Sequence, residues 1–259
     1  MDHLHQALCG AQHRPAPLQA LQPLLVVGGG GALGSAVLAE ALVAGRFSRV
    51  LALVAEPLAS TVRAFQAVTP TQLSAGGASP APAAVIVLER ERHSNGRDDA
   101  FVRPEAADLL LLARRLHAAG VRRLLVVVPH APALLPQALS HGLASLDEAA
   151  VAALGFEHLV LLRAAQPAAM PAHGSLLQRL ARWWLSQLSW MVPPRQQPLR
   201  ASALARCVVQ LARLLPVLPG GSRVIAPETL WLWAQDEAGL IATLARELGA
   251  ASTGLAPPP

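Results

Sequence analysis

Glycines near the start of the chain form the clearest candidate site. Gly29, Gly31 and Gly34 fit the spacing G-x-G-x-x-G, and Gly28, Gly31 and Gly34 fit G-x-x-G-x-x-G equally well. Glycines at such intervals permit a tight turn, let the backbone approach a pyrophosphate, and let a helix pack closely on a strand. A helix that begins there offers free N–H groups and the positive end of its dipole to phosphate. The pattern therefore predicts dinucleotide binding.

A loop of this kind needs a strand before it and a helix after it, and the sequence predicts both. Residues 24–27, LLVV, are typical of a buried parallel strand. From Leu33, apolar residues recur at helical spacing as far as Gly45, which is a plausible helix stop. The cofactor-binding residues predicted around the loop are Gly28, Gly29, Gly31, Ala32, Leu33 and Gly34.

Apolar runs and helical patterns alternate along the rest of the chain. Strands are expected at 49–56, 83–89, 122–128 and 158–163 and within 222–233, and helices at 104–120, 134–155, 173–194, 198–215 and 236–250. Between the strands at 49–56 and 83–89 we expect a short helix at 60–68 and a weak or missing strand. This alternation predicts an α/β fold, a doubly wound, mostly parallel sheet between two helical layers, with a small helical C-terminal lobe.

The domain organisation predicted from these patterns has three parts. Residues 1–22 are expected to be a mobile tail, residues 23–233 a Rossmann-like dinucleotide-binding domain with a substrate or lid segment at 166–198, and residues 234–259 a terminal helix and frayed tail. Because no apolar run reaches about 18 residues, we predict no transmembrane helix. The N-terminus does not have the pattern of a secretory signal, and the two cysteines fit a reducing, cytoplasmic setting.

The composition argues against nucleic-acid binding. The net charge is +5 and 53% of the residues are hydrophobic, but every basic residue is arginine, and the arginines are scattered without an aromatic-laced stripe. His3, His5 and His13 lie in the predicted tail without a cysteine or acid at fixed spacing, so we predict no metal site.

Several segments carry a resemblance to a known family. They are GGGGALGSAVLAEALVAGRFSRVLALV, AFVRPEAADLLLLARRLHAAGVRRLLVVV and DEAAVAALGFEHLVLLR, with a weaker match in PLRASALARCVVQLA. Across residues 23–233 the chain resembles the atypical short-chain dehydrogenase/reductases, and most closely their HIV Tat-interactive-protein-like branch. The resemblance implies a Rossmann fold that binds NAD(P).

The catalytic residues that this resemblance implies are missing. Family members use a serine after the fifth strand and a Tyr-x-x-x-Lys on the next helix, where tyrosine transfers the proton and lysine lowers its pKa. The serine site falls at Val128–Pro129, the tyrosine site at Ser140 and the lysine site at Ala144. The chain contains no tyrosine and no lysine anywhere, so no shift of register restores the pair.

Two acidic positions bear on the cofactor. Glu56 follows the second strand, where NADPH-preferring family members carry basic residues, and a carboxylate there accepts from a ribose 2′-OH. We therefore expect NAD(P) as cofactor, with NAD(H) slightly preferred over NADP(H), unless Glu56 is only a solvated strand end. Glu89 opens a charged run, ERER, after the 83–89 strand. This run either crowds the nicotinamide end of the site or forms a solvated loop.

Two other features leave alternatives open. His130, just after the fifth strand, and His141, beside the lost tyrosine site, are candidates for substituted acid/base work. Trp183, Trp184 and Trp190 lie close together on a predicted helix, which either packs as a lid or core or contacts a protein partner or membrane surface.

The function predicted from the sequence is a dinucleotide-binding Rossmann module without reductase activity, with a regulatory or interaction role. One alternative is an active NAD(P)-dependent oxidoreductase, or an enzyme like a sugar-nucleotide epimerase, that uses His130. The other is an interaction protein with a vestigial loop, which contacts a partner or itself through the tryptophan-bearing C-terminal region.

Overall fold

The computed structural model describes residues 21–74, 81–89, 98–130, 146–165, 199–236 and 239–249. In these ranges, seven strands form one sheet in the order β3-β2-β1-β4-β5-β6-β7, and all neighbours in the sheet are parallel. The strands are β1 (Leu24–Val27), β2 (Val50–Leu53), β3 (Phe65–Val68), β4 (Ala83–Val87), β5 (Arg123–His130), β6 (His158–Ala165) and β7 (Gly221–Ile225). This is the doubly wound, Rossmann-like α/β fold that the sequence predicts.

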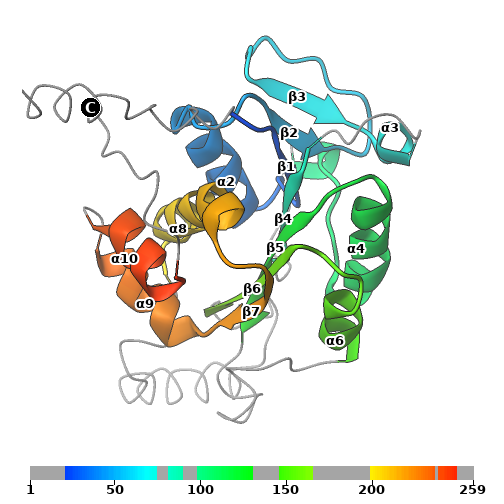
Figure 1. The fold of residues 1–259 in the computed structure, drawn as a ribbon. Coiled ribbons are helices and arrows are strands. Elements are labelled where there is room, and N and C mark those ends of the chain that lie inside the picture. Colours follow the sequence, from blue (N-terminus) through cyan, green and yellow to red (C-terminus); the bar gives the residue numbers. More distant parts are fainter. Residues whose placement is uncertain are drawn as a thin grey trace, which may run out of the picture.

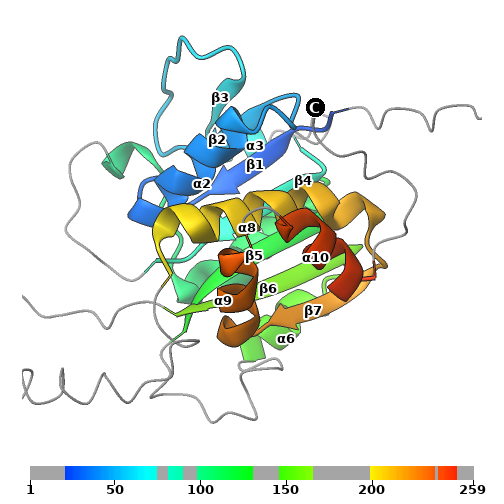
Figure 2. The same ribbon diagram turned by 90° about the vertical axis from the view of Figure 1, so that its left-hand side faces the viewer.

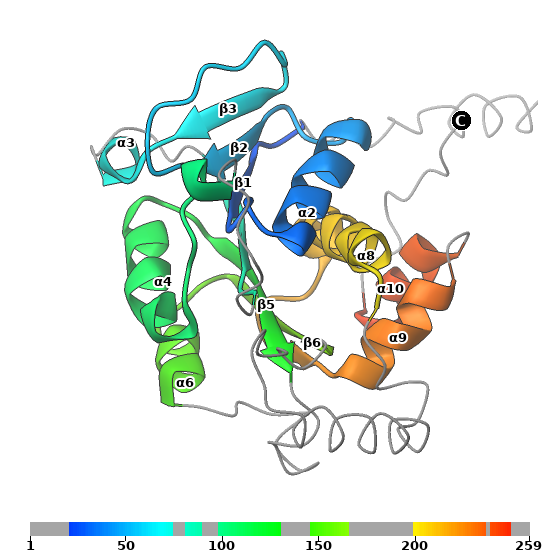
Figure 3. The same ribbon diagram turned by 180° about the vertical axis from the view of Figure 1, so that it is seen from behind.

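Helices cover both faces of the sheet, as Figure 1 shows. One face carries α2 (Ala32–Val43), α8 (Ala201–Leu214), α9 (Pro227–Gln235) and α10 (Leu240–Glu247), which lie together in front of the strands in Figure 2. The other face carries α3 (Pro70–Ser74), α4 (Leu109–Ala118) and α6 (Leu146–Ala152), which lie together on the far side of the sheet from α2 and α8 in the rear view of Figure 3. The sheet is therefore the middle of three layers.

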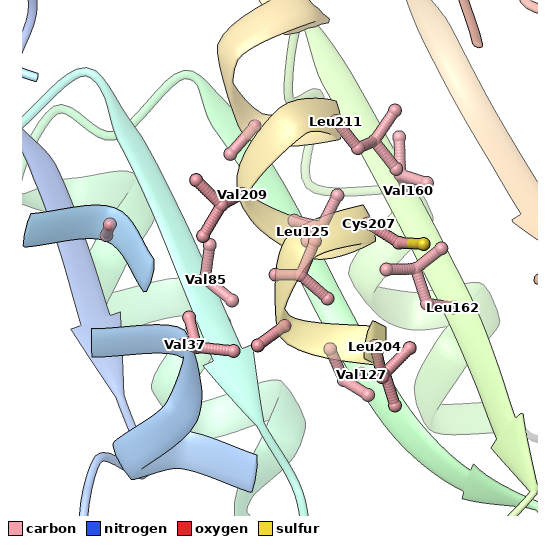
Figure 4. Close-up of a cluster of buried hydrophobic side chains, with 14 of the residues drawn as sticks. Val37, Val85, Leu125, Val127, Val160, Leu162, Leu204, Cys207, Val209 and Leu211 are labelled. Atoms are coloured by element: carbon pink, nitrogen blue, oxygen red, sulfur yellow. The ribbon is translucent and has the colours of Figure 1, made fainter. Parts of the chain in front are cut away.

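The strands β1, β2 and β4 are buried on both faces, so their sequences are continuously apolar rather than alternating. Alternate residues of each strand supply the two cores: Val85 and Val87 of β4 face α2 and α8, whereas Ala84 and Ile86 face α4. Figure 4 shows the first core, in which side chains of α8 point toward those of β4, β5 and β6. The same alternation indicates which face of the sheet a side chain at the end of a strand lies on.

The expected helix at 60–68 is wrong. Residues Phe65–Val68 form β3, which pairs with β2 in the register Val50↔Phe65, and the next helix begins only at Pro70. Pro70 sets the start of this later helix, because proline disfavours helical backbone in the residue before it and is well suited to a helix's first turn. The backbone of 65–68 is instead satisfied by pairing with β2.

The C-terminal helices join the first core. Leu240 and Leu244 of α10 are buried with Trp233 of α9, and the indole Nε1 of Trp233 donates a hydrogen bond to Glu247 at 2.7 Å. Among the helices of the described ranges, none is long and apolar enough to cross a membrane. The predicted tail at 1–22, apart from its last two residues, and the predicted lid at 166–198 lie outside the described residues, as do Trp183, Trp184 and Trp190.

Candidate functional site

The candidate site lies where β1 meets α2, at the point where the order of successive strands in the sheet reverses. The chain runs from β1 outward to β2 and β3, then returns to place β4 on the other side of β1. Ligands of open α/β sheets bind in the crevice at the carboxyl ends of the strands at such a switch point. The glycine loop that follows β1 stands at this place.

Gly28 makes the turn out of β1. Its φ is +87°, in the left-handed region that L side chains rarely adopt. A Cβ there would also overlap the carbonyl oxygen of Val87 on β4 and approach the ring of Pro104 to 3.2 Å. Both the backbone angle and the space therefore require glycine at this position.

Gly34 lies in the first turn of α2 and packs directly on Gly28. A Cβ at Gly34 would overlap the carbonyl oxygen of Gly28, so any larger residue would push the helix away from the loop. Sequence spacing left two interpretations of the glycine pattern open. A Cβ at Gly29 would crowd the side chains of Leu38 and Phe101, so the packing is compatible with both spacings, and of the two alternatives only Gly28 has a left-handed φ.

Gly31 is the N-cap of α2, with extended backbone at φ −82° and ψ 178°. Capping residues usually supply a side-chain oxygen to the free amides of the first turn, and glycine has none. The acceptor instead comes from just beyond β4: the backbone N–H of Leu33 donates a hydrogen bond to the carboxylate of Glu89. A Cβ on Gly31 would overlap that same carboxylate.

Of the charged run 89–92, the structure describes only Glu89, whose carboxylate lies on the first turn of α2. Residues 90–92 lie outside the described residues, so the two interpretations of the run stay untested. The alternation of side chains along β4 is a sequence signal that predicts on which face of the sheet Glu89 lies. Ala83, Val85 and Val87 face the α2 side of the sheet, and Glu89 continues the same series.

Residues 98–104 form a second wall of the site. Phe101 makes an antiparallel bridge with Val54, the backbone N–H of Val102 donates to Leu53 O at 3.1 Å, and that of Ala55 donates to Ala100 O at 2.9 Å. The segment thereby crosses the carboxyl ends of β1 and β2, with Phe101 against Gly29. Glu56 comes directly after Ala55 and is exposed. Its carboxylate is therefore accessible to a ligand, at the position where the ribose of a dinucleotide is expected.

His130 is the last residue of β5 and pairs in register with Ala165 of β6. It lies at the carboxyl edge of the sheet, two strands from β1, which corresponds to about 10 Å across the sheet. Ser140, His141 and Ala144 lie outside the described residues. Within the described ranges, no group of three or more histidine, cysteine or acidic side chains is placed to hold a metal ion.

A buried ion pair lies under the same edge on the opposite face. The guanidinium Nη2 of Arg163, near the end of β6, donates to the Glu148 carboxylate of α6 at 2.9 Å, and both side chains are less than one-tenth exposed. Neither residue was singled out from the sequence. The pair connects α6 to the sheet next to the strand that carries His130.

Comparisons with known proteins give structural neighbours of low similarity. No family model matches the chain, and no curated protein matches its sequence. A UDP-N-acetylglucosamine 4-epimerase from Bacillus cereus is 15% identical over 91% of this chain and 87% of its own, with a TM-score of 0.43. The Bordetella bronchiseptica enzyme WbmG, solved in complex with NAD, is 15% identical over 93% and 92% of the two chains, with a TM-score of 0.42.

A human epimerase family protein solved with NADPH is also 15% identical, over 89% of this chain and 81% of its own, with a TM-score of 0.45. These neighbours do not confirm the Tat-interactive-protein-like branch. Similarity at this level carries no argument about the site, which therefore depends on the geometry of the glycine loop.

Proposed function

We propose that the chain binds a nicotinamide dinucleotide at the glycine loop, with its pyrophosphate against the first turn of α2. The observation that carries this proposal is the packing of Gly34 on the left-handed Gly28 at the sheet's switch point. It lets the chain turn sharply and brings backbone amides close to a ligand, which is the steric purpose of glycine in a dinucleotide loop. NAD(H) is preferred over NADP(H), because the exposed Glu56 accepts from a 2′-OH and repels a 2′-phosphate.

The bound dinucleotide would supply a hydride donor or acceptor, but the chain has no Tyr–Lys pair to move the accompanying proton. We therefore assign the protein a cofactor-binding role, regulatory or in protein interaction, without reductase activity, and place it among proteins related to the atypical short-chain dehydrogenase/reductases. The absence of both residue types from the sequence supports this assignment.

Calorimetric titration with NAD⁺ tests the proposal, with Gly31→Asp as the blocking variant. Aspartate is a good N-cap residue and the Glu89 carboxylate, at the end of a long side chain, turns aside for it, so the variant is expected to fold while its own carboxylate occupies the space that a phosphate needs. Ala39→Asp adds the same charge at an exposed position of the same helix, beyond its first turn, and serves as the matched control. Binding to the wild type and to Ala39→Asp, with loss in Gly31→Asp, supports the proposal. Equal binding by all three proteins contradicts it.

A second candidate function is favoured by the position of His130 at the carboxyl edge of β5. An imidazole there is a candidate to transfer a proton in an oxidoreductase or an epimerase-like reaction. Cofactor turnover with carbonyl or sugar-nucleotide substrates that disappears in His130→Ala would support it, and turnover unchanged by that substitution would remove the mechanism.

A further inference from the structure

Glu89 reaches the glycine loop because β4 is the direct neighbour of β1. The two strands pair through Val27↔Ile86, and Gly28 lies against the carbonyl of Val87. Pairing with β5 continues one residue beyond β4, where the Leu88 N–H donates to Val127 O at 3.0 Å. The sheet therefore holds the backbone beside Glu89 close to the loop, and the Glu89 side chain lies on the α2 side of the sheet.

The Glu89 carboxylate makes the contacts of a bound anion. One oxygen accepts from the Leu33 N–H, and the other lies over the Cα of Gly31, where any side chain would collide with it. Helix N-termini favour negative charge, and α2 has no acidic residue of its own in its first turn.

The same amides are the donors that a dinucleotide loop offers to pyrophosphate. A phosphate oxygen and the Glu89 oxygen cannot both accept from the Leu33 N–H within the space above Gly31. Two anions in contact would also repel each other. A dinucleotide must therefore displace Glu89 before its pyrophosphate reaches the helix.

We infer that Glu89 is an internal competitor for the pyrophosphate, an autoinhibitory contact that sets the affinity of the glycine loop; this inference rests on the proposed dinucleotide binding. Only molecules in which the carboxylate has left the loop bind cofactor. The observed dissociation constant is then the intrinsic one divided by the fraction of such molecules. Removal of the carboxylate increases that fraction to one.

The experiment compares NAD⁺ and ADP binding to the full chain, its Glu89→Ala and Glu89→Gln variants, and Glu40→Gln. Glu40 lies on α2 seven residues beyond Leu33, about 10 Å along the helix, so Glu40→Gln makes the same change in net charge away from the loop. We expect both Glu89 variants to bind at least about tenfold more tightly than the wild type, since a charge-assisted hydrogen bond no longer competes. Glu40→Gln is expected to bind as the wild type does.

The possible failures are distinct. If the wild type and the Glu89 variants bind NAD⁺ equally, or the variants bind more weakly, the competition is refuted while dinucleotide binding stands. If neither the wild type nor a Glu89 variant binds, both the competition and the proposed function fail. If a Glu89 variant binds NAD⁺ and the wild type has no measurable affinity, both the competition and the proposed function are supported. The hydrogen-exchange rate of the Leu33 amide gives a second readout: it should rise in Glu89→Ala but not in Glu40→Gln, and an unchanged rate in Glu89→Ala contradicts the inference.

Discussion

Arg163 and Glu148 form a buried ion pair that joins the carboxyl end of β6 to α6. The Nη2–Oε2 distance is 2.9 Å, and both side chains are nearly excluded from solvent. A buried pair of this kind need not stabilise the fold more than apolar residues would, but a single charge left without its partner is costly.

Substitution of Arg163 by Met is therefore expected to lower the free energy of unfolding by about 3–5 kcal/mol, because the buried Glu148 carboxylate would lose the guanidinium that it faces. The double variant Glu148→Leu/Arg163→Met should recover most of that loss. Urea denaturation measures both, and Arg114→Met, an exposed position on α4, should change stability by less than about 0.5 kcal/mol. A double variant as unstable as the single one would contradict this account.

The glycines differ in what a methyl group would cost. Gly155 has a φ of +79°, and no atom lies within 4 Å of the position that a Cβ would take, so Gly155→Ala should cost only the left-handed strain, about 1–2 kcal/mol. Gly28→Ala carries a similar strain plus overlap with Val87, so its cost should exceed that of Gly155→Ala by about 1–3 kcal/mol. Chemical denaturation tests the order, and equal costs would show that the loop is not tightly packed.

Cys207 predicts a pH dependence in the alkaline range. Burial raises the pKa of its thiol from the ordinary value of 9.0 to about 11, against the smaller opposing influence of Arg206. The folded chain thus holds a proton that the unfolded chain loses. The stability from this group is complete below pH 9 and is lost as the pH rises through 11, by about 2–3 kcal/mol in total.

The amino-acid composition makes this pH dependence easier to measure. The chain has no lysine and no tyrosine, so those groups do not titrate in the same range. Cys207→Ala should remove most of the fall in unfolding free energy between pH 9 and pH 11, whereas Cys9→Ala should preserve it. An alkaline limb that is unchanged in Cys207→Ala would contradict the assignment.

Glu56 should determine the preference between the two dinucleotides. Glu56→Gln removes the charge that opposes a 2′-phosphate and weakens acceptance from a 2′-OH, so the ratio of NADP⁺ to NAD⁺ affinity should rise about tenfold, equivalent to about 1.4 kcal/mol. Calorimetric titration of both ligands gives the ratio. Glu157→Gln, at the amino end of β6, makes the same charge change and should leave the ratio unaltered.

The local sequence determined most of the elements. The strand at 24–27, the helix beyond it and the alternation of strands and helices follow from buried apolar runs and helical spacing, because both faces of a parallel sheet must be apolar. The predicted helix at 60–68 was wrong because the residues there have only a weak local preference for helix or strand. Pairing with β2 decided the conformation of Phe65–Val68, and pairing between segments does not appear in a hydrophobic pattern.

By itself, the sequence also determined that the chain has a glycine loop but no tyrosine or lysine, since motifs and absences can be read from a list of residues. Only the tertiary structure decided which glycines form the close contact, through the approach of Gly34 to the carbonyl of Gly28. It alone brought Glu89, 56 residues from Leu33 along the chain, onto the first turn of α2. The physical reason is that β4 pairs with β1 across a long connection, so the neighbours of the loop are set by sheet topology and not by proximity in the sequence.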